Sequence, residues 1–229
     1  MENGEKEVNA PTKPVSGVLL AAGKGERLGG LSKAFIQNRS CTLLEICIAK
    51  MAPLCREIVV VVSSAEREKA ESAVAGLKYR VRLVSGGKTR QDSLHNGVAA
   101  CTSDLVLIHE VARPLCPPAL FERVLAAGTD GPATACFSPD VRDAVVLVDD
   151  GMQYIEETLP KKRVAYAQTP QVFNTRELKT FLASAIENGW HNDSSVALCL
   201  RAGMKVRCVY HDFQNLKVTY PQDLKLLET

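Results

Sequence analysis

Residues 15–27 read VSGVLLAAGKGER, an apolar stretch that passes directly into small residues, glycines and charged side chains. The pattern predicts a buried β-strand over 18–21 with a loop at its carboxyl end. Small residues let a backbone approach a ligand closely, and successive amides in such a loop can hold a phosphate. The alternative interpretation is a plain turn after a strand, with its charges solvated.

The loop matches neither of the two common phosphate-binding motifs. The P-loop pattern Gly-x-x-x-x-Gly-Lys-Ser/Thr is absent from it. The dinucleotide fingerprint requires a third glycine, but Glu26, Arg27 and Leu28 follow Gly25 instead. A dehydrogenase is therefore disfavoured. Arg27 and Lys33 lie just beyond the glycines, close enough in sequence to meet on a triphosphate bound over the loop.

The chain beyond this loop alternates short apolar runs with longer helical patterns. The expected strands cover 18–21, 58–62, 81–84, 105–109 and 133–137. The expected helices between them cover 42–51, 64–75, 91–100 and 118–127. This alternation predicts an α/β fold with a mostly parallel, Rossmann-like sheet covered by helices on both faces. The run IVVVV at 58–62 is apolar throughout, as burial on both faces of a sheet requires.

The pattern changes after Asp140. Residues 144–148, the turn DDG at 149–151 and residues 152–156 predict a β-hairpin. An isolated two-stranded ribbon is marginal in water, so the hairpin is expected to pack against something, for example a second copy of the chain. Helices over 175–188 and 193–201, a strand over 205–210 and a short helix opened by Pro221 are expected to follow.

The composition is that of one globular domain of the larger kind. The 229 residues are 46% hydrophobic and 24% charged, and the formal net charge is only +2. The chain lacks the strong overall positive charge that is typical of proteins that bind nucleic acids or membrane surfaces, so neither partner is expected. No run approaches the ~18 apolar residues of a membrane span, and residues 1–14 lack the apolar core of a signal peptide.

These features predict a cytoplasmic protein. Residues 1–14 are expected to form a disordered lead, and 15–229 a single globular domain. The eight cysteines contain no Cys-x-x-Cys pair and no zinc-site spacing with histidines. We therefore expect reduced thiols, mostly buried in the core.

A second glycine pair ends the third expected strand: GG at 86–87 is followed by TRQDS at 89–93. Because the carboxyl ends of parallel strands form one rim, both glycine loops should face the same cleft. The fourth strand delivers HEVARP at 109–114 to that rim, with an acid and an arginine suited to phosphate, metal-bound water or a hydroxyl. We expect His109 to be hydrogen-bonded within the structure, with a catalytic base as the alternative.

Six motifs in this order resemble the 2-C-methyl-D-erythritol 4-phosphate cytidylyltransferase family. They are LLAAGKGER at 19–27, the stretch 86–93, HEVARP at 109–114, VRD at 141–143, QTPQVF at 168–173 and NLKVT at 215–219. The match covers nearly everything from Val15 onward. The glycine loop alone is common to many sugar-nucleotide enzymes, so the six motifs together carry the resemblance.

The resemblance implies an enzyme that joins CTP to 2-C-methyl-D-erythritol 4-phosphate and releases pyrophosphate, in non-mevalonate isoprenoid biosynthesis, with Mg²⁺ as cofactor. In that chemistry the acceptor phosphate attacks the α-phosphate in line, so the protein positions two anions and neutralises developing charge. No nucleophilic side chain is needed, and no Ser-His-Asp or Cys-His arrangement is identifiable in the sequence. The hairpin, about 140–161, resembles the family's dimerisation arm, which implies a homodimer with shared active sites.

The resemblance also implies roles for individual residues. Arg27 and Lys33 match the pair that stabilises the pentacoordinate phosphorus. Lys217 matches the lysine that positions the acceptor phosphate, and Lys161 falls where an arginine grips the acceptor. The residues that match nucleotide-contacting loops are Ala21, Ala22, Gly23, Gly25, Gly87 and Ser93. The residues that fall at acceptor-binding positions are Glu110, Arg113 and Asp193. No metal ligand is assigned.

Several positions depart from the family pattern on the acceptor side. Glu110 replaces an aspartate, Ala144 a threonine and Lys161 an arginine, and NDS at 192–194 replaces Thr-Asp-Glu/Asp. An ammonium cannot reproduce the bidentate fork of a guanidinium, so the acceptor could differ. The alternatives are a cytidylyltransferase for ribitol phosphate or another polyol phosphate, a noncatalytic nucleotide-binding relative, and a uridylyl- or adenylyltransferase.

Overall fold

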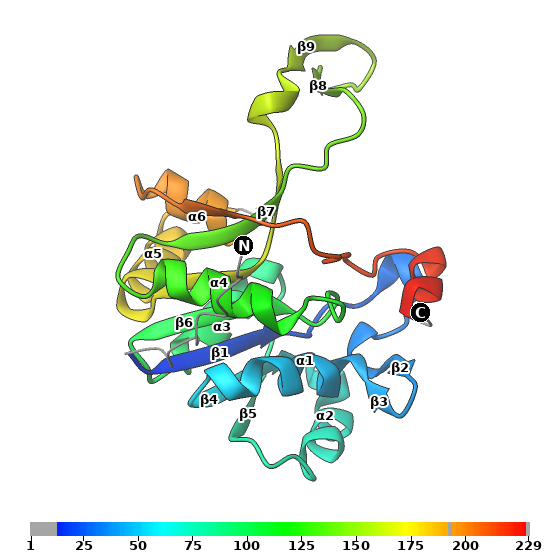
Figure 1. The fold of residues 1–229 in the computed structure, drawn as a ribbon, viewed down its shortest axis with the longest axis vertical. Coiled ribbons are helices and arrows are strands. Elements are labelled where there is room, and N and C mark those ends of the chain that lie inside the picture. Colours follow the sequence, from blue (N-terminus) through cyan, green and yellow to red (C-terminus); the bar gives the residue numbers. More distant parts are fainter. Residues whose placement is uncertain (1–12, 192–193, 228–229) are drawn as a thin grey trace, which may run out of the picture.

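The structure is a computed structural model and describes residues 13–191 and 194–227 (Figure 1). Most of the segment expected to be a disordered lead therefore lies outside the described residues. Lys13, near its end, lies against the body of the fold and donates hydrogen bonds to the carbonyl oxygen of Thr129 and to Asp130.

A seven-stranded sheet forms the centre of the described chain, in the order β11-β7-β10-β6-β1-β4-β5. Its strands are β1 (Val15–Leu20), β4 (Glu57–Val62), β5 (Val81–Ser85), β6 (Leu105–Glu110), β7 (Thr134–Ser138), β10 (Tyr166–Asn174) and β11 (Arg207–Tyr210). The pairs β1–β4, β1–β6, β4–β5 and β7–β11 are parallel. Only β10 among these strands runs antiparallel to its neighbours, so the mostly parallel sheet is confirmed.

Helices cover both faces of this sheet, as predicted (Figure 1). They are α1 (Leu43–Met51), α2 (Arg67–Val74), α3 (Arg90–Ala99), α4 (Pro118–Gly128), α5 (Thr175–Glu187) and α6 (Ser195–Arg201). Successive residues of a strand point to opposite faces. Leu19 thus packs in one core cluster with residues of α1, α2 and α4, whereas Val18 and Leu20 pack in a second with residues of α3, α5 and α6.

Short elements complete the described chain. Two strands, β2 (Gln37–Asn38) and β3 (Cys41–Thr42), form a small antiparallel pair that the sequence did not predict. The 3-10 segments are η1 (Glu26–Leu28), η2 (Lys33–Phe35), η3 (Ala52–Leu54), η4 (Ser64–Glu66), η5 (Lys161–Arg163) and η6 (Pro221–Leu227). The helix expected to begin at Pro221 is therefore a 3-10 helix.

The expected hairpin exists and projects from the body of the fold (Figure 1). Its strands are β8 (Val145–Val148) and β9 (Ile155–Leu159), which pair antiparallel in a separate sheet. The predicted second strand, 152–156, begins too early. The reason is a longer turn, in which a carboxylate oxygen of Asp149 accepts hydrogen bonds from the backbone N–H groups of Gln153 and Tyr154.

The sequence missed strand β10. Proline is rare in the interior of a sheet because it lacks an N–H donor, and Pro170 stands in the middle of this segment. The structure accommodates it with a shift of register between Ala167 and Gln171. Beyond this irregularity, β10 pairs regularly with both β6 and β7.

Two further features concern the setting of the protein. Among the described residues, no helix is both long and apolar enough to cross a bilayer. The eight cysteines all lie within the described ranges and are free thiols, as expected. Cys41 and Cys208 are exposed, so the expectation of burial fails at these two positions.

Candidate active site

A cleft lies where the strand order of the sheet reverses. The chain moves from β1 to β4 and β5 on one side, whereas β6 lies on the other side of β1. Connections that leave such a point in opposite directions open a crevice at the carboxyl ends of the strands. The cleft there has a volume of about 550 Å³, and it is lined by residues 22–27, 87–90 and 110–112 together with Leu20, Lys33, Ser93 and Lys217. That volume suits a ligand of nucleotide size.

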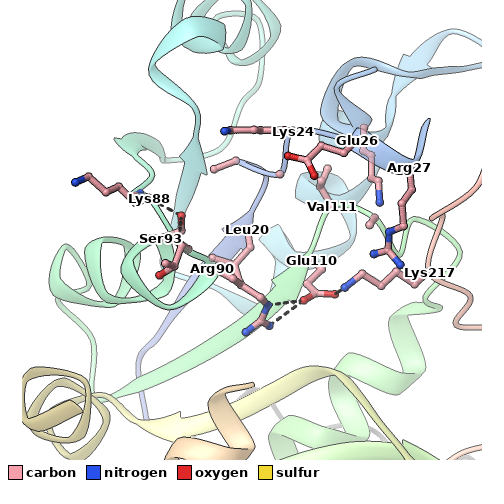
Figure 2. Close-up of a pocket in the computed structure, with 17 residues that line it drawn as sticks. Leu20, Lys24, Glu26, Arg27, Lys88, Arg90, Ser93, Glu110, Val111 and Lys217 are labelled. Carbon is pink, nitrogen blue, oxygen red and sulfur yellow. Dashed lines mark hydrogen bonds and ion pairs between the residues drawn. The ribbon is translucent and has the colours of Figure 1, made fainter. Parts of the chain in front are cut away.

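The cleft is strongly cationic although the whole chain is nearly neutral. Among the described residues, six cationic side chains line it: Lys33, and the five labelled in Figure 2, which are Lys24, Arg27, Lys88, Arg90 and Lys217. Two carboxylates, those of Glu26 and Glu110, oppose them. A positive field concentrated in a cleft attracts anionic ligands such as nucleotides.

Two glycines fix the shape of the loops at this cleft. Gly25 has a φ of +64°, and a Cβ there would lie 1.9 Å from the carbonyl oxygen of Leu31. A Cβ on Gly86 would lie 2.6 Å from the Cβ of Ala22. The two glycine loops predicted to share a rim therefore touch each other, and larger side chains would separate them.

The second glycine loop is held by hydrogen bonds at the start of α3. Thr89 caps the helix and forms a capping box with Asp92. The hydroxyl of Ser93 accepts a hydrogen bond from the N–H of Gly87 at 3.1 Å and donates one to the carbonyl oxygen of Thr89 at 3.0 Å. This bonding fixes the backbone on which Lys88 and Arg90 stand at the rim.

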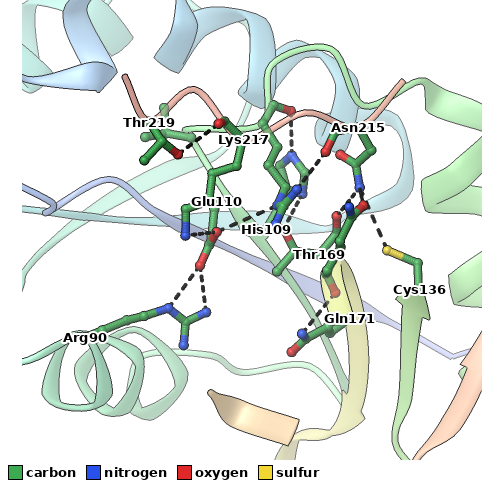
Figure 3. A network of polar contacts seen from close by, with 12 residues as sticks. Arg90, His109, Glu110, Cys136, Thr169, Gln171, Asn215, Lys217 and Thr219 are labelled. Carbon is green, nitrogen blue, oxygen red and sulfur yellow. Dashed lines mark hydrogen bonds and ion pairs between the residues drawn. The ribbon is translucent and has the colours of Figure 1, made fainter. Parts of the chain in front are cut away.

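Glu110 joins three parts of the chain at the end of β6 (Figure 3). Its Oε1 accepts hydrogen bonds from Arg90 at 2.8 and 2.9 Å, and its Oε2 accepts one from the Nζ of Lys217 at 2.8 Å. Burial by itself would raise the pKa of Glu110, but Arg90 and Lys217 lower it to about 2. Glu110 is therefore ionised at neutral pH and orients both cations.

Lys33 lies among like charges. Burial, and then the positive charges of Lys217 and Arg27, lower its pKa from the usual value. A polyanion placed between cations that repel one another in this way stabilises them. Perturbed pKa values of this kind are typical of functional sites.

His109 and Arg113 hold the rim together from inside. His109 is fully buried; its ring nitrogens lie 3.1 Å from the carbonyl oxygen of Arg113 and 3.1 Å from the hydroxyl of Thr169. Burial lowers the pKa of His109 to about 3, so the ring is neutral. The structural interpretation of this histidine is confirmed.

Arg113 ties the loop after β6 to the segment that carries Lys217. It is buried and donates a hydrogen bond to the carbonyl oxygen of Asn215 at 2.6 Å. The side-chain amide of Asn215 in turn donates to Gln168 and to the carbonyl oxygen of Thr169, both at 2.8 Å (Figure 3). The QTPQVF and NLKVT motifs thus form the support behind the cleft.

Comparison with known proteins shows the family of the chain. A family model described as 2-C-methyl-D-erythritol 4-phosphate cytidylyltransferase matches residues 15–229. The chain belongs to this family.

Individual relatives agree with the family model. The 2-C-methyl-D-erythritol 4-phosphate cytidylyltransferase of Nostoc punctiforme is 34% identical, over 92% of this chain and 95% of its own length. A bifunctional enzyme IspD/IspF of Nitratidesulfovibrio vulgaris is 36% identical, but this chain spans only 56% of it. The crystal structure of the cytidylyltransferase of Thermus thermophilus matches with a TM-score of 0.76 and 30% identity, over 94% of this chain and 97% of that one.

Most residues predicted from the family motifs meet in the cleft. Those that line it are Ala22, Gly23, Gly25, Arg27, Lys33, Gly87, Ser93, Glu110 and Lys217. Ala21 instead is buried, and its N–H donates to the carbonyl oxygen of Val61. Arg113 stands behind the cleft rather than in its lining. Their expected ligand contacts remain predictions.

Two predicted residues lie elsewhere. Lys161 stands in η5 at the base of the arm, where its Nζ donates to the carbonyl oxygen of Arg142. In this single chain it is not part of the cleft lining. Asp193 lies outside the described residues.

The sequence analysis did not assign three cations that line the cleft to the site: Lys24, Lys88 and Arg90. All three stand inside or beside motifs that the sequence predicts at the rim. Their position in these motifs could therefore have predicted that they line the cleft. The ion pair between Arg90 and Glu110 could not be predicted in this way, because only the fold brings the two segments together.

Proposed function

We propose that the chain transfers the cytidylyl group of CTP to 2-C-methyl-D-erythritol 4-phosphate, giving 4-diphosphocytidyl-2-C-methyl-D-erythritol and pyrophosphate in non-mevalonate isoprenoid biosynthesis. The observation that carries this proposal is the cleft with six cations over a glycine loop, in a member of this family. Joining two polyanions requires concentrated positive charge, which this cleft supplies.

We propose that each side of the cleft binds one substrate. The triphosphate lies over the glycine loop, between Arg27 and Lys33. The acceptor phosphate lies toward Lys217, which Glu110 orients. An oxygen of the acceptor phosphate forms a bond to the α-phosphorus, and the bond from that phosphorus to the β-bridging oxygen breaks, so pyrophosphate leaves with that oxygen. Arg27 and Lys33 stabilise the charge that develops on the equatorial oxygens.

We propose Mg²⁺ as the cofactor that enters with CTP. Among the described residues, no group of three or more His, Cys, Asp or Glu side chains is arranged to hold a metal ion. This fits Mg²⁺ bound by substrate phosphates with one or two carboxylates and water. Glu26 and Glu110 are the carboxylates in the cleft. Glu26 is the better candidate, since Glu110 already forms ion pairs with Arg90, Lys217 and Arg113. When bound, the ion neutralises phosphate charge.

We propose a homodimer in which the arm reaches a second subunit. Met152, Tyr154 and Ile155 of the hairpin are 80%, 72% and 65% exposed, which is unusual for large apolar side chains gathered on one ribbon. A two-stranded ribbon also needs packing to be stable. Lys161 would then contribute to the partner's acceptor site, which accounts for its distance from the cleft of its own chain.

Sedimentation tests the assembly directly. We expect a dimer at micromolar concentration, and we expect Tyr154→Lys with Ile155→Lys to give a monomer with reduced activity because charge is buried at the interface. Leu200→Lys is the matched control, since Leu200 is an apolar side chain that is 58% exposed on α6 and is not part of the arm. A parent chain that sediments as a monomer with full activity would rule out the shared site.

We also propose that residues 15–229 form a single domain in the cytoplasm. One sheet with helices on both faces supports the single domain. The free thiols support a reducing compartment.

Pyrophosphate release across four nucleoside triphosphates and several polyol phosphates tests the substrates. We expect the highest kcat/KM for CTP with 2-C-methyl-D-erythritol 4-phosphate. Activity with ribitol 5-phosphate but not with 2-C-methyl-D-erythritol 4-phosphate would instead favour a cytidylyltransferase for ribitol phosphate. Tight CTP binding without pyrophosphate release on any acceptor would show a noncatalytic relative.

A further inference from the structure

The side chain of Arg27 contacts an aromatic ring that no motif singles out. The guanidinium carbon of Arg27 lies 5.6 Å from the centre of the Tyr220 ring. This distance is within the range of a cation–π interaction. Arg27 itself is exposed and stands on the short segment η1, so without a contact its long side chain would sample many rotamers.

Tyr220 stands on a fixed backbone. The N–H groups of Thr219 and Tyr220 both donate to a carboxylate oxygen of Asp223 at 2.8 Å. The N–H of Val218, which is fully buried, donates to the carbonyl oxygen of Ala112 at 2.8 Å. The ring is therefore attached to a segment that is bonded to the loop after β6 on one side and to η6 on the other.

An aromatic ring suits this position better than a carboxylate. Arg27 lies close enough to Lys33 for its charge to lower the lysine's pKa, so the cations repel one another before a ligand binds. A carboxylate would attract the guanidinium but also neutralise it and compete with phosphate. The face of a ring attracts the guanidinium while leaving its charge and its N–H donors for a ligand.

We propose that Tyr220 is a positioning residue that holds the guanidinium of Arg27 over the glycine loop, ready for the triphosphate. The segment 217–223 then sets two cations at once, because it also carries Lys217. This inference rests on the proposed function only in naming CTP as the anion.

The test compares Tyr220→Ala and Tyr220→Phe in the full chain. We expect Tyr220→Ala to lower kcat/KM for CTP about fivefold to tenfold and to weaken CTP binding measured by calorimetry. Tyr220→Phe retains the ring and should stay within about twofold of the parent. The control is Tyr79→Ala, since Tyr79 has a similar exposed fraction, 42% against 46%, precedes β5 and does not line the cleft.

Repeating the Tyr220 substitution in an Arg27→Ala variant separates positioning of Arg27 from a general effect on the stability of the chain. In Arg27→Ala, further replacement of Tyr220 by alanine should change CTP binding by less than about twofold, because the contact is already lost. An equal loss in both backgrounds, or a parent-like Tyr220→Ala, would overturn the inference. If the parent itself released no pyrophosphate from CTP, the proposed function would fail while the binding measurements still decided the role of Tyr220.

Discussion

Replacing either Arg27 or Lys33 with alanine should lower turnover by about 10²- to 10³-fold while leaving the chain folded. Both side chains line the cleft beside the glycine loop, where the α-phosphate would lie. A preorganised cation that meets developing charge typically contributes about 3 kcal/mol to the transition state. Removing Lys33 also relieves repulsion with Arg27 and Lys217, so the free energy of unfolding should not fall. Steady-state pyrophosphate release and thermal unfolding measure the two effects.

Lys69→Ala is the matched control for this experiment. Lys69 is an exposed lysine on α2 and is not part of the cleft lining. It should retain parent turnover. Near-normal turnover in both Arg27→Ala and Lys33→Ala would remove the pair from the mechanism.

Replacing Lys217 with alanine should separate the two substrates. We expect kcat/KM for the acceptor to fall about 10²-fold, because a charged contact to the attacking phosphate is lost. The dissociation constant of CTP should change by less than about threefold, since the glycine loops are unchanged. Glu110 keeps its pairing with Arg90 in this variant, so the rim should stay in place.

The control here is Lys225→Ala, an exposed lysine in η6, eight residues further along the same segment. It should behave like the parent with both substrates. A loss of CTP affinity as large as the loss of acceptor efficiency would show that Lys217 serves the nucleotide instead.

Much of the fold and cleft could be predicted from local sequence. The apolar runs at β1 and β4 and the alternation with helices indicated a parallel sheet, and parallel strands must end on one rim. That logic brought Gly25, Gly87 and Glu110 together before any contact was known.

The rest depended on contacts between distant segments. Strand β10 carries Pro170, which argues against a strand unless the neighbouring strands absorb a change of register. The start of β9 depends on how the Asp149 side chain closes its turn. The pairing of Arg27 with Tyr220 joins residues from opposite ends of the chain, and no local pattern encodes it.

Glu110 illustrates why the acceptor side was hardest to predict. The sequence showed only that a glutamate stands where the family pattern has an aspartate. The structure shows this carboxylate bonded to Arg90 and Lys217 together, so its charge organises two cations. A carboxylate in that position can also accept hydrogen bonds from acceptor hydroxyls, which keeps a polyol phosphate compatible with the cleft.

The most direct test of the account is to identify the product formed from CTP and 2-C-methyl-D-erythritol 4-phosphate with Mg²⁺. Phosphorus NMR and mass spectrometry should show 4-diphosphocytidyl-2-C-methyl-D-erythritol and pyrophosphate in equal amounts, with neither formed when one substrate is omitted. Unchanged CTP and acceptor after prolonged incubation with a folded, CTP-binding chain would contradict the account.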